Sequence, residues 1–276
     1  MIIGLFLLIW IGVATLLTLL TNLSLWFIPL WILIGLLAAS LFVLSTFFIG
    51  RYLTKMGKVT GRIRHFYVWN IADFVRMFIV RIRIKVIGKE NIPKDTNYVV
   101  YGNHKSNVDP IIIVSALRTR MGFAAKSELF GVKLLNGWID NIGCININRE
   151  NDREAVREIL KGIGYVKQGL SMGIFPEGGI KSRDTNYMVD VKPGAYKLAT
   201  KAGVPIVPIA LIGSRYIKDR APKKSTKVTM VIGKPIYEEE YKEMTTVELG
   251  DHVFKIINDM ITKHDPNPTN GSYRSK

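Results

Sequence analysis

Hydrophobic and polar positions divide the chain sharply near residue 50. Residues 1–50 contain no Asp, Glu, Lys or Arg, and every charged side chain lies after them. The apolar part consists of two runs, residues 1–20 and 25–49, separated by a short polar break. An apolar helix of about 20 residues is as long as the hydrocarbon core of a bilayer is thick. The pattern predicts a two-helix hairpin over residues 1–50 that anchors the chain in a membrane.

A basic segment follows the hairpin directly. Arg51, Lys55, Lys58, Arg62 and Arg64 occur with no acidic residue among them. Because such clusters mark the cytoplasmic side of membrane segments, we expect the rest of the chain on the cytoplasmic face of the cell membrane. A hairpin that spans the bilayer and a shallow hairpin in one leaflet both satisfy this sidedness. The cluster would also attract anionic lipid headgroups, unless it acts as a topology signal alone.

After the anchor, the pattern changes to short strands that alternate with helices. Residues 51–80 are predicted to be a basic linker with an interfacial helix at 66–80. Residues 81–86 alternate between basic and aliphatic side chains, which is typical of a half-buried strand. Further strands are predicted at 98–101, 122–125, 144–147, 174–175, 206–211 and 227–232, and helices at 110–117, 151–170 and 245–263.

This alternation predicts an α/β fold with a largely parallel central sheet flanked by helices. The catalytic domain would cover residues 81–263. Residues 264–276 are polar, with prolines and a glycine, and are predicted to form a disordered tail.

The amino-acid composition shows that the chain is strongly basic. The 276 residues carry 38 Lys and Arg against 22 Asp and Glu, a formal net charge of +16, which favours an anionic partner. Membrane lipid fits better than nucleic acid, because the basic residues lack an aromatic-stacking or recognisable binding motif. The single cysteine, Cys144, excludes an intramolecular disulfide. No Cys, His or acidic cluster has metal-ligand spacing, so we expect neither a metal nor a bound cofactor.

One histidine lies where an α/β fold builds its sites. His104 follows the strand predicted at 98–101, and functional residues gather at the carboxyl ends of such strands. Asp109 lies five residues further on, before Pro110, a pattern typical of a helix start. A carboxylate can hold one imidazole nitrogen and stabilise the imidazolium. The other nitrogen can then remove a proton from a substrate hydroxyl.

These residues belong to a series of motifs. Asn-His-Lys-Ser-Asn-Val-Asp at 103–109 resembles the first signature, Asn-His-x-x-x-x-Asp, of the glycerolipid acyltransferase family, in particular the 1-acylglycerol-3-phosphate acyltransferases. Later family signatures follow in order: Ala-Lys-Ser-Glu-Leu at 125–129, Gly-Cys-Ile-Asn-Ile-Asn-Arg at 143–149, Phe-Pro-Glu-Gly at 175–178, Lys-Pro-Gly-Ala at 192–195 and Val-Pro-Ile-Val-Pro at 204–208. The resemblance spans roughly residues 82–235.

The resemblance implies direct acyl transfer. His104 would activate the free hydroxyl of lysophosphatidic acid, with Asp109 orienting it, and the product would be phosphatidic acid. The acyl group would come from acyl-CoA or acyl-carrier protein as co-substrate, without a metal or a covalent enzyme intermediate. Another lysophospholipid, or glycerol 3-phosphate, stays open as the acceptor.

The resemblance also implies how the acceptor is held. It assigns Lys126, Arg149, Glu177, Gly178 and Lys192 to substrate binding. Arginine in particular binds phosphate through two hydrogen bonds, although basic residues at strand ends are often only solvated. One departure concerns the headgroup. Gly179 and Ile180 stand where the family has Thr-Arg or Ser-Arg, so Lys181 and Arg183 are candidates for the missing cation.

Two other functions compete with this one. Gly-Leu-Ser-Met-Gly at 169–173 matches the Gly-x-Ser-x-Gly motif of esterases, with Ser171 as nucleophile. That motif requires a strand, a tight turn and then a helix, whereas here a helix precedes Ser171 and a strand follows it. The third hypothesis is a non-catalytic protein that binds the lipid surface through its basic charge.

Overall fold

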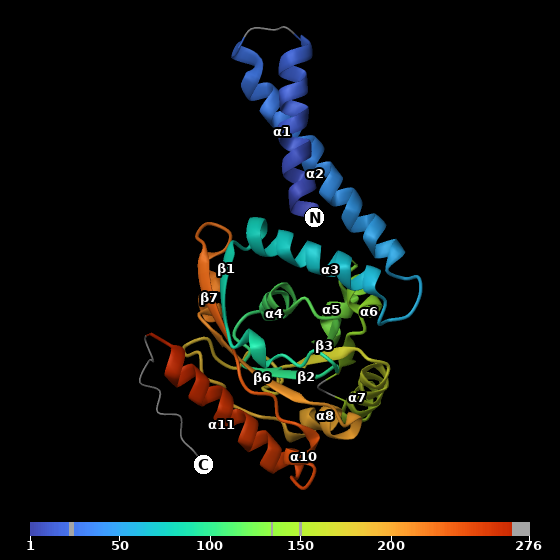
Figure 1. Cartoon of the computed structure of the whole chain (residues 1–276), viewed down its shortest axis with the longest axis vertical. Coiled ribbons are helices and arrows are strands. Elements are labelled where there is room, and N and C mark those ends of the chain that lie inside the picture. The colour runs from blue at the N-terminus through green and yellow to red at the C-terminus, as the bar shows by residue number, and fades with distance from the viewer. Residues whose placement is uncertain (22–24, 134, 149–150, 267–276) are drawn as a thin grey trace.

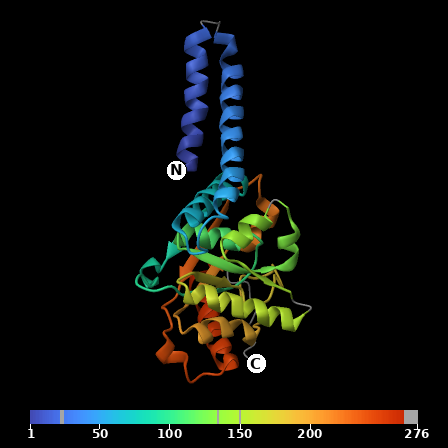
Figure 2. The same ribbon diagram turned by 90° about the vertical axis from the view of Figure 1, so that its right-hand side faces the viewer.

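The computed structural model describes residues 1–276 except 22–24, 134, 149–150 and 267–276. A helical hairpin projects from an α/β domain, as the two perpendicular views in Figure 1 and Figure 2 show. The two apolar helices of the predicted hairpin and the predicted fold class are both confirmed, and anchoring in a membrane stays a prediction.

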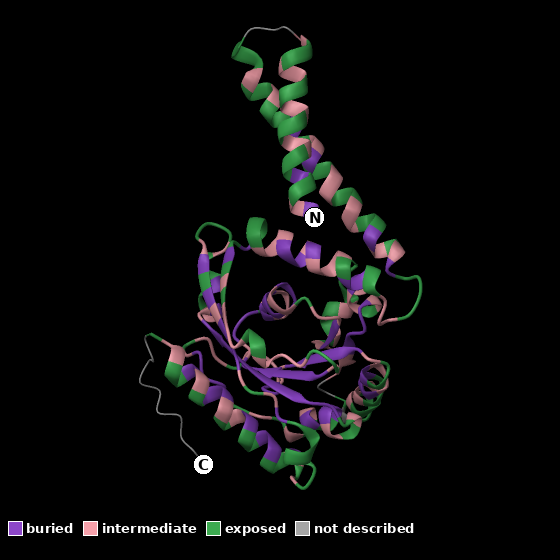
Figure 3. Ribbon diagram, viewed as in Figure 1, coloured by how far each residue is buried: buried purple, intermediate pink, exposed green. Residues whose placement is uncertain are grey.

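The hairpin consists of α1 (Ile2–Thr21) and α2 (Ile28–Leu53), with a 3-10 turn, η1 (Leu25–Phe27), before α2. Both apolar stretches have a mean hydropathy of 2.6 and are only 11% buried, which excludes a role as core helices of the domain (Figure 3). They are long and apolar enough to cross a membrane. At Gly35 the helices approach so closely that a Cβ would collide with the Trp10 carbonyl, which is typical of helix packing in lipid.

α1 is fixed to the domain through an aromatic cluster. Beneath it lies α3 (Arg62–Phe74), which runs into a π-helical turn, η2 (Val75–Ile79). The Phe6 ring centroid lies 5.6 Å from those of both Phe74 and Phe78. The interfacial helix predicted at 66–80 therefore begins four residues earlier and ends in a π turn.

α2 is fixed separately, to the short helix α6 (Asn136–Asn141). The Phe47 and Trp138 ring centroids are 5.3 Å apart. Gly50 lies so close to the Trp138 ring that a Cβ there would come within 2.8 Å of it. The Arg51 guanidinium donates to the Lys133 carbonyl oxygen at 2.7 Å. Both helices of the hairpin are thus attached to the α/β domain.

The domain is built on a seven-stranded sheet with the order β1-β7-β6-β2-β5-β3-β4. Its strands are β1 (Ile82–Ile87), β2 (Val99–Gly102), β3 (Met121–Lys126), β4 (Ile145–Ile147), β5 (Ser171–Ile174), β6 (Ile206–Ile212) and β7 (Thr226–Ile232). Among the strands of the described residues, only β6 and β7 pair antiparallel, and all other neighbours are parallel. β2 lies at the centre, and all four of its residues are buried.

Helices cover both faces of the sheet (Figure 1). α4 (Asp109–Leu117) and α3 pack on the face toward the hairpin. α7 (Asp152–Lys167), α8 (Lys197–Ala202) and α11 (Thr246–His264) cover the other face. The shorter elements are η3 (Lys89–Asn91), α5 (Ser127–Gly131), η4 (Pro193–Tyr196), η5 (Ser214–Tyr216), α9 (Ile217–Arg220) and α10 (Glu238–Tyr241).

Most other predicted boundaries differ from the structure by one residue, and two differ by three. The helix predicted at 151–170 ends at Lys167, because Gly169 adopts a left-handed conformation with φ +91°. The strand predicted at 174–175 occupies Ser171–Ile174 instead. At the C-terminus, α11 ends at His264, and the Asp265 carboxylate accepts a hydrogen bond from Asn186 at 2.8 Å. The rest of the tail predicted to be disordered, residues 267–276, lies outside the described residues.

A buried histidine makes the junction beneath the hairpin sensitive to pH. His65 of α3 is 1% exposed, and its Nε2 lies 3.0 Å from the Val59 carbonyl oxygen. Burial lowers its pKa from 6.5 to about 4, against the opposing effect of the Val59 hydrogen bond and with smaller effects of Arg120 and Arg64. Because the folded pKa is the lower one, stability is fully present above pH 6.5 and is lost as the pH falls toward 4.

We expect the wild type to lose about 2 kcal/mol relative to His65→Gln between pH 7 and about pH 5. Glutamine can still donate to the Val59 carbonyl but does not titrate. The measurement is the urea unfolding midpoint in detergent micelles at both pH values. An equal pH dependence in the two proteins would show that His65 does not contribute.

Candidate active site

A buried asparagine carries the chain out of the sheet at the end of β2. Asn103 is 0% exposed. Its side-chain oxygen accepts from the Leu211 amide at 2.7 Å, and its amide nitrogen donates to the Leu211 carbonyl oxygen at 2.8 Å. A second bond from the same nitrogen reaches the Asn186 carbonyl oxygen at 2.7 Å. The side chain thus continues the pairing with β6 while the backbone turns away, which places His104 at the carboxyl end of the sheet.

A single carboxylate oxygen organises the turn that follows. Oδ2 of the fully buried Asp109 accepts from His104 Nδ1 at 3.0 Å. It also accepts from the backbone amides of Lys105 and Ser106, each at 2.8 Å. Asp109 begins α4 as the sequence indicates, and its Oδ2 thereby bonds the turn that precedes that helix. Because a carboxylate only accepts, Nδ1 carries the proton and the Nε2 lone pair is available.

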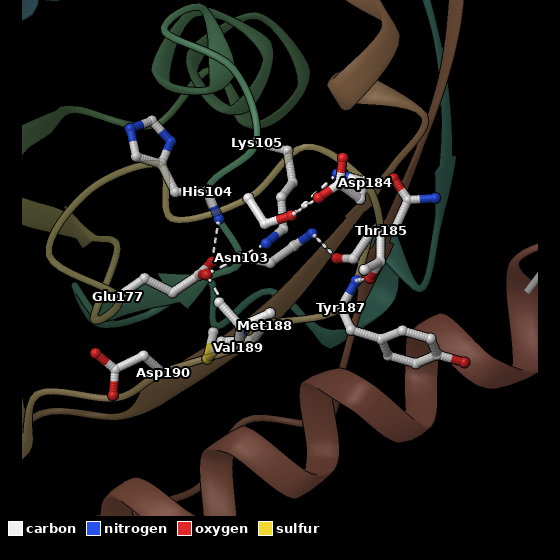
Figure 4. A network of polar contacts seen from close by, with 12 residues as sticks. Asn103, His104, Lys105, Glu177, Asp184, Thr185, Tyr187, Met188, Val189 and Asp190 are labelled. Carbon is white, nitrogen blue, oxygen red and sulfur yellow. Dashed lines mark hydrogen bonds and ion pairs between the residues drawn. The ribbon is translucent and has the colours of Figure 1, made fainter. Parts of the chain in front are cut away.

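A second carboxylate fixes the backbone of the histidine (Figure 4). Oε1 of Glu177, in the turn after β5, accepts from the His104 amide at 2.8 Å. Oε2 accepts from Lys105 Nζ at 3.2 Å and from the Val189 amide at 3.3 Å. Lys105 and Glu177 are both 0% exposed. Burial raises the pKa of the Glu177 carboxyl, and the Lys105 ammonium and the hydrogen bonds act in the opposite direction.

The histidine ring lies against an apolar cavity. It stacks on Phe175, with ring centroids 4.2 Å apart and planes at 14°. Phe175 also lines a cavity of about 610 Å³. The other walls come from aliphatic residues of α7, the ends of β3 and β5, and residues 192–201. The imidazole and the cavity therefore share Phe175.

Two of the predicted substrate-binding residues lie at this cavity. Gly178 has φ +69°, a conformation that favours glycine. A Cβ there would lie 2.9 Å from Lys192 Cε, so the lysine stem passes directly over it. Both residues line the cavity. Glu177, the third, is adjacent, but its oxygens are bonded within the protein; its contact with a substrate stays a prediction.

The other predicted cations do not line the cavity or are not among the described residues. Lys126, at the end of β3, is exposed and pairs with Glu128 at 2.9 Å. Lys181 is exposed, and Arg183 is half-buried further along the same loop. Arg149 lies outside the described residues. The roles of all four stay predictions.

The serine of the esterase motif has no access to substrate. Ser171 is the first residue of β5, at the opposite end of that strand from Glu177. It is 1% exposed, and its Oγ accepts a hydrogen bond from the Tyr98 amide at 3.2 Å. This geometry contradicts a nucleophilic role.

Sequence reasoning missed Asn103 and Lys105 as supports of the site. Both flank His104 in the sequence. A lysine such as Lys105 is normally expected to be exposed to solvent, so its role was not predicted. Its burial follows from Glu177, which lies 72 residues away in the sequence. Phe175 was recognised only as part of a motif, and its contact with the imidazole is equally long-range.

The arrangement of these side chains indicates the kind of reaction that the site can catalyse. A half-buried histidine that is paired with a buried aspartate and keeps a free imidazole nitrogen, set beside an apolar cavity, suits the activation of a hydroxyl group beside an apolar substrate.

Comparisons with known proteins agree with this kind of reaction. A family model described as Acyltransferase matches residues 83–212. A probable 1-acyl-sn-glycerol-3-phosphate acyltransferase of Mycoplasma genitalium is 30% identical over 205 residues, 69% of this chain and 75% of that protein. The Bacillus subtilis 1-acyl-sn-glycerol-3-phosphate acyltransferase is 31% identical over 60% of this chain and 79% of its own length. The Borreliella burgdorferi enzyme of the same name is 34% identical over half of this chain, which spans 54% of that protein.

A solved structure supports the fold. The crystal structure of the 1-acyl-sn-glycerophosphate (LPA) acyltransferase PlsC from Thermotoga maritima superposes with a TM-score of 0.65. It covers 80% of this chain and 88% of its own, at 24% identity. The relatives from Mycoplasma genitalium and Bacillus subtilis, matched over 75% and 79% of their own length, show that the chain belongs to the acyltransferase family.

The buried ion pair gives a test of the site's construction. We expect Lys105→Met to lower stability by about 3–5 kcal/mol, because it leaves a buried carboxylate without its cation. The double variant Lys105→Met/Glu177→Gln removes the charge and retains an acceptor oxygen, so it should recover part of that loss. Urea unfolding midpoints of the wild type, both single variants and the double variant provide the measurement. Strictly additive losses would contradict a coupled buried pair.

Proposed function

We propose that this acyltransferase moves a fatty acyl group from a thioester to the free hydroxyl of lysophosphatidic acid, giving phosphatidic acid, with His104 as general base. The observation that carries the mechanism is the bond from His104 Nδ1 to Asp109, which leaves Nε2 as the proton acceptor. Nε2 takes the hydroxyl proton while the oxygen attacks the thioester carbonyl carbon. The tetrahedral intermediate then expels the thiolate, which takes the proton from the imidazolium and leaves as thiol.

Relatives and local charge support the choice of acceptor. The proteins compared above are named 1-acyl-sn-glycerol-3-phosphate acyltransferases. Lys192 places a cation over Gly178 at the cavity, where it would bind a phosphate. Lys126, Arg149, Lys181 and Arg183 are further candidates for that role. Glu177 shapes the turn that presents Gly178.

The cavity suits an acyl chain. Its walls are mostly alanine, valine, leucine and isoleucine side chains, with lysines among the lining residues. Burial of a hydrocarbon chain there is favourable in proportion to the apolar area removed from water. The chain would enter with its thioester beside Phe175 and His104. The thioester carrier would be acyl-CoA or acyl-carrier protein.

The N-terminal hairpin would hold this site at its substrate. In this proposal residues 1–50 anchor the chain in the cell membrane, residues 51–80 follow the interface, and residues 81–263 form the catalytic domain on the cytoplasmic face. The basic residues after the hairpin support that orientation. Lysolipid and long acyl chains are both concentrated at such a surface.

The proposal predicts that His104→Ala reduces phosphatidic acid formation by about 10²–10⁴-fold, the usual contribution of general-base catalysis. Asp109→Asn should also lose most activity, because it disturbs the tautomer. The assay uses lysophosphatidic acid in detergent micelles, with labelled acyl-CoA and acyl-carrier protein as separate donors. Ser171→Ala is the matched control and should retain activity if the protein folds normally.

Full activity of a folded His104→Ala protein would overturn the mechanism. If the wild type forms no phosphatidic acid with either donor but acylates another lysophospholipid or glycerol 3-phosphate, the acceptor is wrong and the chemistry stands. Loss of activity only in Ser171→Ala would instead support an esterase-type enzyme.

A further inference from the structure

Two segments that are far apart in the sequence lie side by side at the foot of the hairpin. β1 and β7 are parallel, and their first residues, Ile82 and Thr226, are paired. The turn η2 before β1 is therefore beside the connection that leads into β7. Arg81 joins them, because its guanidinium donates to the Lys223 carbonyl oxygen at 2.8 Å and its carbonyl accepts from the Thr226 amide at 3.0 Å. Figure 1 and Figure 2 both show this orange connection at the hairpin end of the domain.

The turn η2 presents apolar side chains to the outside. Met77, Phe78 and Ile79 are 45%, 40% and 54% exposed. Phe78 also contacts Phe6 in the second turn of α1. Because α1 would enter the bilayer from this point, the apolar turn lies at the depth where the hydrocarbon region begins.

The neighbouring connection presents cations. Lys218, Arg220, Lys223 and Lys224, which we call the basic rim, are all exposed. Between residues 218 and 224 the only acidic residue is Asp219. Just before the rim, Tyr216 is 40% exposed, and the Arg220 guanidinium lies 5.7 Å from its ring centroid.

Exposed apolar side chains beside lysines, arginines and a tyrosine are typical of a surface at the membrane–water interface. Basic residues near a bilayer are attracted to anionic headgroups. An acidic protein or a nucleic acid would match the cations of the rim but would leave the adjacent apolar turn at the foot of α1 unexplained. The combination favours lipid.

We propose that the basic rim and η2 form a second contact between the catalytic domain and the bilayer, in which the rim binds anionic phospholipid headgroups. This inference rests on insertion of the hairpin into the membrane. The hairpin alone fixes the domain along one narrow stem. A second contact beside it would restrict how the domain tilts and would keep the site at a constant height above its lipid substrate.

A fluorescent probe beside the rim tests the contact. Ser225→Cys offers a half-exposed labelling site next to Lys224, while the native Cys144 is buried. The labelled full chain is reconstituted into vesicles of phosphatidylcholine, with or without phosphatidylglycerol, that carry a headgroup spin label as quencher. We expect quenching in the phosphatidylglycerol vesicles that weakens at high salt. A probe at Lys255→Cys on the far helix α11 should show none.

Charge variants identify the rim as the cause. Replacement of Lys218, Arg220, Lys223 and Lys224 by Gln in the Ser225→Cys protein should abolish the phosphatidylglycerol-dependent quenching. The matched control replaces four exposed lysines away from the hairpin, Lys234, Lys242, Lys255 and Lys263, by Gln and should leave it intact. Thermal unfolding of both variants verifies the fold.

The inference fails if the probe at 225 is quenched equally in both vesicle types, or if the rim variant behaves like its control. The inference is also overturned if the probe is quenched in neither vesicle type. That result would indicate that the basic rim binds an acidic protein or a nucleic acid instead. Flotation of the protein with vesicles reports insertion of the hairpin separately. Acyl transfer in micelles reports the proposed function, so the two proposals can fail independently.

Discussion

The hydrogen bonds accepted by one buried oxygen, Oδ2 of Asp109, are the constraint on which the site depends. This oxygen joins the imidazole of His104 to two backbone amides of the same turn, so rotation of the ring away would cost one of the three hydrogen bonds that the buried oxygen accepts. Glu177 fixes the same turn from the other side through the His104 amide. Glu177, in the turn after β5, and Asp109, in α4, therefore both hold His104. Its free nitrogen is already oriented before a substrate binds.

The sheet positions this turn relative to the hairpin and the cavity. Parallel pairing brings the ends of β2 and β5 together, which places Glu177 beside His104. The hairpin attaches to the face covered by α3 and α4, whereas the cavity opens between the sheet and α7 on the other face. His104 lies at the edge between these faces, next to Phe175. In the proposed reaction, an acceptor from the bilayer and an acyl chain in the cavity would therefore approach the imidazole from different sides.

Much of this organisation is legible in the sequence, and the remainder depends on contacts between distant residues. The hairpin can be predicted because helices in a hydrocarbon environment must consist almost entirely of uncharged, apolar residues. The strands can be predicted from segments with alternating polar and apolar residues or with continuous aliphatic residues. The five-residue spacing of His104 and Asp109 is local, so their pairing could be predicted. The strand order, the antiparallel β6–β7 pair, the burial of Lys105 against Glu177 and the attachment of α2 through Trp138 all join segments far apart in the chain. No pattern in a single sequence specifies such contacts.

The central claim is that Asp109 keeps the proton on Nδ1 and leaves Nε2 of His104 as the base. Nitrogen-15 NMR of histidine-labelled protein in micelles measures this tautomer directly, with the His104 signals assigned by their loss in His104→Gln. The account predicts a protonated Nδ1 and an unprotonated Nε2 in the neutral ring, and a redistribution of the two tautomers in Asp109→Asn. A neutral ring that carries its proton on Nε2 in the wild type would contradict it.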